Sequence, residues 1–175
     1  MLYVMRHGQV ETNIHNQING WNPEELTTVG IEQARSAENK VKALNIEYVF
    51  CSPIVRTKQT LNNLNLDEKI TVYYDDRLKE RNAKSMVYKK VDSVDNNIWY
   101  DKTKDIVYED AEGFKSIIER VKSLLDEIKD KYYGKNILLI THGDICKAIY
   151  LYFNQDVQNI SEFYQDNCEI VSYEL

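Results

Sequence analysis

The spacing of apolar and polar residues along the chain predicts strands that alternate with helices. Short apolar runs of strand length lie at residues 2–6, 46–51, 70–74, 136–141 and 168–174. The run Ile137-Leu138-Leu139-Ile140 contains no polar residue, which is typical of a strand buried on both faces. These segments therefore predict a sheet whose middle is covered on both sides.

Helical periodicity fills the intervals between the predicted strands. It is clearest over residues 112–132, where apolar residues recur at three- and four-residue steps and Gly134 then ends the helix. Further helices are predicted over 27–44, with Thr27 as the N-cap, over 54–64 and over 143–153. Alternating strands and helices predict an α/β fold, a three-layer α/β/α arrangement with a mainly parallel central sheet.

Length and composition favour one domain without a membrane segment. The chain has 175 residues, 43% of them apolar and 29% charged, and shows no linker or repeat, so residues 1–175 are expected to form a single domain. No apolar run reaches the length of a membrane span, and the first residues lack the layout of a signal peptide. We therefore expect no membrane partner.

The net charge bears on which ligands the protein can bind, and the cysteines bear on the cellular compartment in which it works. The net charge of −6 argues against nucleic-acid binding, although a local basic pocket for a small anion remains compatible with it. The three cysteines match no metal-binding or redox spacing, and Cys51 and Cys146 adjoin apolar runs, which predicts buried free thiols and a cytoplasmic location. The sequence does not indicate an oligomeric state.

Polar residues of similar type follow three of the predicted strands. Arg6-His7-Gly8 follows the first, Ser52-Pro53-Ile54-Val55-Arg56 the second, and Thr141-His142-Gly143 the fourth. Ligands of parallel sheets gather at the carboxyl ends of the strands, so these residues are expected to meet at one edge. Glycine after each histidine is expected to let the backbone turn sharply and approach a ligand closely.

Two histidines and two arginines in one pocket would repel one another unless an anion lay among them. Phosphate is the natural candidate, because guanidinium groups match its oxygens with paired hydrogen bonds. A helix that begins after Gly143 would add backbone N–H donors. One histidine can attack phosphorus while the arginines stabilise charge on the oxygens. Taken singly, such a histidine or arginine is more often an ordinary polar or surface residue, and it is their joint placement that favours a phosphate site.

Several blocks in order resemble the histidine phosphatase superfamily, the phosphoglycerate-mutase-like enzymes, over nearly the whole chain. The blocks are RHGQVETN at 6–13, LTTVGIEQA at 26–34, SPIVRTKQT at 52–60, LKE at 78–80, THGD at 141–144 and the closing DNCEIVSYEL. The resemblance implies a phosphoglycerate-mutase-like fold. It also implies a phosphatase or mutase that needs no metal or other cofactor.

The resemblance also implies a role for each matching residue. His7 is the expected nucleophile, Glu80 the expected general acid and base, and His142 the second catalytic histidine. Arg6, Asn13, Arg56 and Gly143 are the residues expected to bind the phosphoryl group. From the residues alone, Glu80 could be a solvated carboxylate and Asn13 a turn residue or helix cap. His15 is expected to be exposed.

The chain departs from the family pattern at three places. Val10 stands where the family usually has Thr or Ser, which predicts the loss of one polar contact near the phosphate. Asp144 replaces a common glycine and is expected to favour the protonated form of His142. The segment of about 84–110 is short, mixed in charge and without arginine, and its apolar and aromatic residues either cover the substrate or pack a small cap onto the core.

These features favour a phosphomonoester hydrolase acting through a phosphohistidine on a small phosphorylated metabolite, with inorganic phosphate as product. A mutase would need basic residues to hold a second anionic group, and segment 84–110 lacks an obvious set of them. Phosphoglycerate mutase-type phosphoryl transfer and a phosphate-binding or interaction module with weak or lost catalysis are the alternatives. The sequence does not name the substrate.

Overall fold

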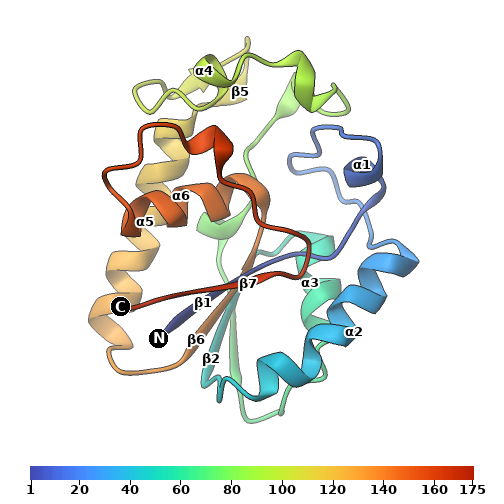
Figure 1. Cartoon of the computed structure of the whole chain (residues 1–175), viewed down its shortest axis with the longest axis vertical. Helices are drawn as coiled ribbons and strands as arrows, with labels where there is room; N and C mark the ends of the chain where they lie inside the picture. Colours follow the sequence, from blue (N-terminus) through green and yellow to red (C-terminus); the bar gives the residue numbers. More distant parts are fainter.

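The computed structural model, which describes residues 1–175, contains a five-stranded sheet in the order β3-β2-β6-β1-β7. Its strands are β1 (Leu2–Arg6), β2 (Tyr48–Cys51), β3 (Thr71–Tyr74), β6 (Ile137–Thr141) and β7 (Ile170–Tyr173). All neighbouring pairs are parallel except β1 and β7, which run antiparallel. The predicted mainly parallel sheet is therefore confirmed (Figure 1).

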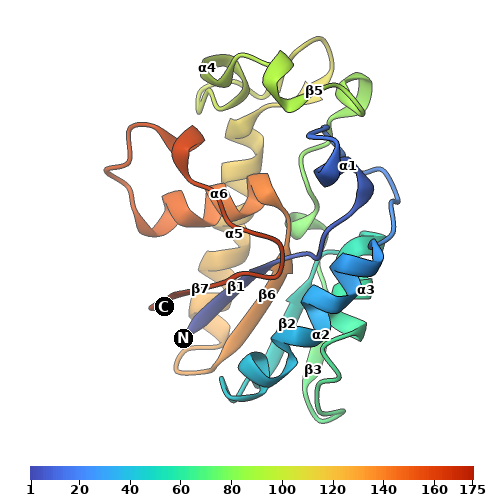
Figure 2. The same ribbon diagram turned by 45° about the vertical axis from the view of Figure 1, so that its right-hand side comes forward.

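Helices cover both faces of the sheet (Figure 2). The helices are α1 (Glu11–Ile14), α2 (Thr28–Lys42), α3 (Val55–Asn62), α4 (Asn96–Trp99), α5 (Phe114–Lys131) and α6 (Gly143–Phe153). Short 3₁₀ turns add η1 (Asp76–Leu78), η2 (Lys84–Met86), η3 (Val91–Ser93) and η4 (Ile160–Glu162). The predicted three-layer arrangement is confirmed, with α5 and α6 on one face and α2 and α3 on the other.

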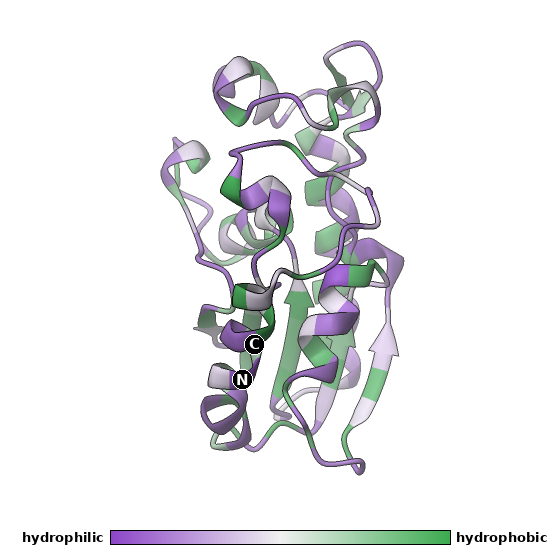
Figure 3. Cartoon of the chain, turned by 90° about the vertical axis from the view of Figure 1, so that its right-hand side faces the viewer, coloured by the Kyte–Doolittle hydropathy of each residue, from purple (hydrophilic) through white to green (hydrophobic).

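Strand β6 divides the core between the two faces. Ile137 and Leu139 pack into the cluster under α5 and α6, whereas Leu138 and Ile140 pack into the cluster under α2 and α3. All four side chains are fully buried, as the unbroken apolar run predicts. Hydropathy colouring shows green in the middle of the sheet and a paler edge strand (Figure 3).

Two of the predicted helix boundaries have clear structural causes. Thr27 caps α2, since its hydroxyl oxygen accepts a hydrogen bond from the Gly30 N–H at 3.1 Å. The helix predicted from residue 112 begins instead at Phe114, because Ala111–Glu112 forms β5 and pairs with β4 (Ile106–Val107). Gly113 passes so close to the carbonyl of Lys104 that a Cβ there would lie 2.1 Å from its oxygen.

Segment 84–110 lies above the carboxyl ends of the sheet strands, next to the loop that follows α1 (Figures 1 and 2). Trp99 and Val107 from this segment form a small buried cluster with Ile18, Ala83 and Ala111. Backbone hydrogen bonds join Ile18 to the segment, donating to the carbonyl of Lys89 and accepting from Tyr88. The segment has its own apolar core and is tied to the loop at 15–22.

Candidate active site

Strand register brings the two predicted histidines side by side. Arg6 at the end of β1 pairs with Thr141 at the end of β6, so His7 and His142 occupy the next positions of neighbouring strands. The His7 N–H donates to the Thr141 carbonyl at 3.0 Å, and the two imidazole rings have centroids 5.2 Å apart. The third strand end joins them through the Ser52 N–H, which donates to the Ile140 carbonyl.

The His7 ring is fixed in one tautomer by its surroundings. Its Nδ1 lies 2.7 Å from the Gly8 carbonyl, which can only accept, so Nδ1 carries the proton. Nε2 then keeps its lone pair and accepts a hydrogen bond from Arg56 Nε at 3.2 Å. Burial and the nearby Arg56 and Arg6 cations hold the His7 pKa well below its ordinary value. The ring is therefore neutral, with its lone pair on Nε2.

His142 is buried beside His7 and leaves one nitrogen without a partner. Its Nε2 lies 2.8 Å from the Ser52 hydroxyl oxygen, which also accepts a hydrogen bond from the Ile54 N–H at 3.4 Å. The other ring nitrogen, Nδ1, is also buried and has no hydrogen-bond partner in the chain.

The predicted effect of Asp144 on His142 is wrong. Burial, the Arg56 cation and the neighbouring His7 hold the His142 pKa well below its ordinary value. Asp144 is not positioned to reverse this, because its carboxylate pairs with Arg81 at 2.7 Å and accepts a hydrogen bond from the Tyr100 hydroxyl. His142 is therefore neutral, and Asp144 acts on other groups.

Both predicted arginines lie at the histidine pair. Arg56 is fully buried, and its guanidinium donates to His7 Nε2 and to the loop at 19–22, including the Gly20 carbonyl at 2.8 Å. Burial lowers the Arg56 pKa to about 10, which leaves it cationic at neutral pH. Arg6 donates through Nη1 to the Gln165 carbonyl at 2.8 Å, while its buried Nε has no partner.

Asn13 and Gly143 line the same cavity, but Val10 does not. Asn13 accepts a hydrogen bond from the Val10 N–H through Oδ1, which leaves its amide N–H₂ available to a ligand. Val10 is fully buried and bridges to Leu26 in a short antiparallel contact. The expectation that Val10 removes a polar contact near the phosphate is therefore wrong, since its side chain packs into the core.

The glycines that follow the two histidines, Gly8 and Gly143, have different surroundings. A Cβ on Gly8 would lie 2.5 Å from the Gly30 carbonyl oxygen, so Gly8 permits close packing against the start of α2. This corrects the expectation that Gly8 makes room for a ligand. A Cβ on Gly143 would lie 3.8 Å from Glu80 Oε2 and 4.0 Å from Arg6 Nε, so Gly143 does border the polar centre.

Glu80 lies in the cavity wall with its carboxylate near Gly143 and Arg6. Its Oε1 accepts the N–H of Arg81 at 2.9 Å. Burial, followed by the negative charge of Asp144, raises the Glu80 pKa from an ordinary 4.5 to about 7. The raised pKa lets Glu80 keep a proton closer to neutral pH than an ordinary carboxyl group does, as a group that gives and takes protons requires.

The cavity holding these residues measures about 310 Å³ and has a wall that sequence reasoning missed. This wall comes from residues 161–165, where the Tyr164 ring centroid lies 5.2 Å from the Arg6 guanidinium carbon. The segment has no periodic pattern and no resemblance block, so nothing in the sequence signals it. The cavity also includes Trp99 and Tyr100 from segment 84–110.

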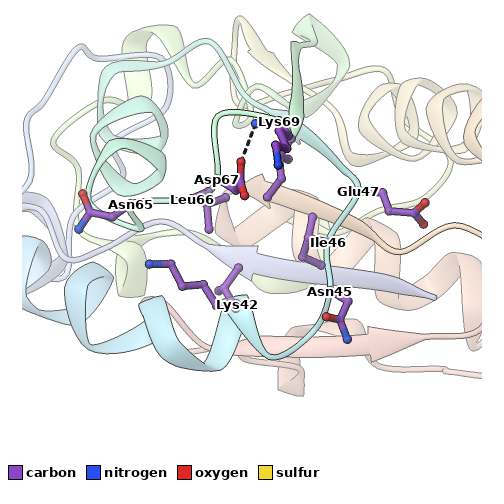
Figure 4. A pocket seen from close by; sticks show the side chains of 10 residues that line it. Lys42, Asn45, Ile46, Glu47, Asn65, Leu66, Asp67 and Lys69 are labelled. Carbon is purple, nitrogen blue, oxygen red and sulfur yellow. Dashed lines mark hydrogen bonds between the residues drawn. The ribbon is translucent and has the colours of Figure 1, made fainter.

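A larger hollow of about 680 Å³ lies at the opposite edge of the sheet (Figure 4). It is bordered by the end of α2 and the turns before β2 and β3, with Lys42, Glu47, Asp67 and Lys69 among its residues. Asp67 accepts the Lys69 N–H within its own turn. The hollow contains no histidine or arginine, and its size alone indicates no chemistry.

Other predicted features are also located by the structure. Cys51 and Cys146 are buried free thiols, as predicted, and Cys168 is a half-buried one. His15 is exposed and contacts Glu11 at 3.0 Å, so it takes no part in the cavity. None of the helices combines the length and apolar character needed to cross a bilayer.

Comparison with known proteins agrees with the geometry of the cavity. The model of the histidine phosphatase superfamily (branch 1) matches residues 2–175. A curated relative, the probable phosphoglycerate mutase GpmB of Escherichia coli O1:K1, is 26% identical over 148 residues, which span 81% of this chain and 69% of that protein.

Solved structures share the fold at low sequence identity. YhfR of Bacillus stearothermophilus has a TM-score of 0.82 at 22% identity, covering 97% of this chain and 88% of that one. A phosphoserine phosphatase from Entamoeba histolytica, solved with 3-phosphoglyceric acid, has a TM-score of 0.82 at 24% identity, covering 97% and 87%. The family model spans almost every residue, and the chain therefore belongs to the histidine phosphatase superfamily, branch 1.

Proposed function

We propose that this protein is a phosphomonoester hydrolase that acts on a small phosphorylated metabolite through a phosphohistidine on His7. The observation that carries the proposal is a neutral histidine whose unprotonated Nε2 lies among cations. Two buried nitrogens beside it, Arg6 Nε and His142 Nδ1, have no partner in the chain. Unpaired buried polar groups are costly, and a phosphoryl oxygen would accept a hydrogen bond from Arg6 Nε, and from His142 Nδ1 when that nitrogen carries the ring proton.

The chemistry proceeds in two displacements. His7 Nε2 attacks phosphorus, the bond from phosphorus to the ester oxygen breaks, and Glu80 gives its proton to that oxygen. Arg56 Nε, which donates to His7 Nε2 at 3.2 Å, turns to a phosphoryl oxygen. A water then attacks phosphorus, Glu80 takes its proton, and the N–P bond breaks to return neutral His7 and inorganic phosphate. Arg6, Arg56, His142, Asn13 and the N–H groups at Gly143 stabilise the charge.

Water is the proposed acceptor because the cavity has no obvious clamp for a second phosphorylated group. Segment 84–110 carries lysines but no arginine, and none of its lysines lines the cavity. Mutase-type phosphoryl transfer is the second candidate, because the curated relative GpmB is named a probable phosphoglycerate mutase. A mutase would interconvert phosphoglycerates and depend on a bisphosphate primer, whereas the proposed hydrolase releases phosphate without one.

We also propose a domain organisation and a cellular compartment for the protein. We propose that residues 1–175 act as one domain in which segment 84–110 is a cap over the site. The three free thiols favour a reducing compartment such as the cytoplasm.

The test is release of phosphate from an aryl phosphate in EDTA by the wild type, His7→Ala and His15→Ala. His15 is a matched control, since it is an exposed histidine outside the cavity. Turnover lost in His7→Ala but kept in His15→Ala is the expected result. Full turnover in His7→Ala overturns the phosphohistidine step. Phosphate binding without turnover in the wild type, over a panel of esters, supports the binding module instead.

A further inference from the structure

Beyond the phosphate-binding end, the cavity wall contains three charged side chains, Arg81, Asp144 and Lys147. The pairing of these three side chains determines whether the alcohol part of a bound ester can bear a charged group. The inference below rests on the proposed function, because it concerns the alcohol part of the same phosphate ester.

Arg81 lies in the cavity wall, where other parts of the protein hold its guanidinium in place. Its Nε donates to Asp144 Oδ2 at 2.7 Å, and its Nη1 donates to the Glu112 carbonyl at 3.0 Å. The guanidinium carbon lies 4.0 Å from the centroid of the Trp99 ring. Its third nitrogen, Nη2, has no hydrogen-bond partner in the chain, but it is buried in a side chain that is only 1% exposed, so a ligand carboxylate reaches it only if Trp99 or Asp144 moves.

Asp144 is the more accessible member of this pair. Its side chain keeps 14% of its surface exposed, against 1% for Arg81, so the carboxylate is the member of the pair that is more open to the cavity. The Tyr100 hydroxyl donates to Oδ1 at 3.1 Å, and each carboxylate oxygen still has a free lone pair. This part of the wall repels an anion and accepts a hydrogen bond from a hydroxyl group.

Lys147 offers no free donor. Its ammonium donates to the carbonyls of Ile160, Ser161 and Phe163, which uses its three protons. The Lys147 side chain is only 8% exposed and lies against the Tyr100 ring. Its function is to hold the loop before residue 165 against α6.

The remaining wall away from the phosphate end is uncharged. It combines side-chain amides, such as Asn16 and Asn96, with apolar surfaces, such as Val91 and Trp99. Amides bond hydroxyl and carbonyl groups, and apolar surfaces cover a ring or carbon chain. A carboxylate placed there would lose its water and face Asp144, while the unpaired Nη2 of Arg81 stays buried behind that pair.

We infer that the physiological ester has an uncharged, hydroxyl-bearing alcohol part, and that Asp144 excludes esters whose alcohol part carries a carboxylate. Asp144 is thus a specificity-determining residue: it neutralises Arg81 and turns its own negative charge toward the substrate.

The test compares two esters that differ at one group, glycerol 3-phosphate and 3-phosphoglycerate. Each is measured as a substrate and as a competitor of aryl phosphate hydrolysis, so that relative affinity is obtained even when turnover is slow. The wild type is expected to favour glycerol 3-phosphate at least tenfold. Asp144→Asn, which keeps the side-chain size and leaves the Arg81 charge uncompensated, should shift this ratio at least tenfold toward 3-phosphoglycerate. Asp130→Asn, at an exposed position on α5, is the matched control and should keep the wild-type ratio.

Asp144→Asn can also change the acidity of Glu80, but such a change affects the hydrolysis of both esters. The ratio between the two esters therefore reports the effect of Asp144 on specificity alone. Equal or better use of 3-phosphoglycerate by the wild type overturns the inference while leaving the hydrolase intact. An unchanged ratio in Asp144→Asn overturns the role of Asp144. Absence of hydrolysis of every ester, the aryl phosphate included, is instead the failure of the proposed function, and the inference falls with it.

Discussion

The raised pKa of Glu80 predicts a specific pH dependence. Burial and Asp144 raise that pKa to about 7, so about 90% of Glu80 is protonated at pH 6 and about 10% at pH 8. At its ordinary value of 4.5 the protonated share at pH 6 would be only about 3%. Because the acid form protonates the leaving oxygen, kcat/KM for an alkyl phosphate should fall about tenfold between pH 6 and pH 8.

The histidines should not produce this decline. Their pKa values are lowered well below the ordinary 6.5, so His7 and His142 are neutral throughout this range. The ester's own phosphate titrates near pH 6, and its contribution is removed by comparison with a second substrate. Removal of Asp144 should lower the Glu80 pKa and move the decline to lower pH.

The assay measures kcat/KM from pH 5 to pH 9 for glycerol 3-phosphate and for nitrophenyl phosphate, whose leaving group departs without a proton. Glu80→Gln should lower the rate on the alkyl ester by about 10²–10⁴ and abolish its decline above pH 7, with a far smaller effect on the aryl ester. An alkyl profile that is flat from pH 6 to pH 9, or a decline that survives in Glu80→Gln, would refute the assignment of Glu80.

Two further predictions concern stability, measured by urea denaturation. Gly8→Ala should cost about 1–3 kcal/mol, because its Cβ would lie 2.5 Å from the Gly30 carbonyl oxygen, whereas Gly143→Ala, with 3.8 Å of space, should unfold like the wild type. Leu139→Ala should cost about 2–5 kcal/mol, since the side chain is fully buried in the central strand, and Ile14→Ala, 55% exposed, should change stability by less than about 0.5 kcal/mol. Equal costs within either pair would contradict the packing seen around that residue.

The local sequence pattern was sufficient to predict the α/β/α layers and the strand ends at which the site lies. The apolar run at 137–140 predicted the central strand, and it is buried on both faces because its alternate side chains enter different clusters. Arg6, Arg56 and His142 were expected together because carboxyl ends of parallel strands share an edge, and the register of β1 with β6 brings His7 beside His142.

Two of the expectations that failed concern where a side chain lies relative to the site. Asp144 adjoins His142 in the chain, yet its carboxylate pairs with Arg81, 63 positions away. Val10 lies within the phosphate-binding motif, yet its side chain is fully buried and is not part of the cavity lining. The sequence positions of Asp144 and Val10 beside the motifs determined where their backbones lie, but not where their side chains point.

The sequence by itself determined the α/β order of elements, the family and the set of residues at the strand ends, because period and motif are local properties. Only the tertiary structure decided the protonation and pairing of those residues. Burial among Arg6 and Arg56 keeps His7 neutral, and burial beside Asp144 holds a proton on Glu80. Both effects depend on desolvation and on charges brought close by packing, which no stretch of sequence contains.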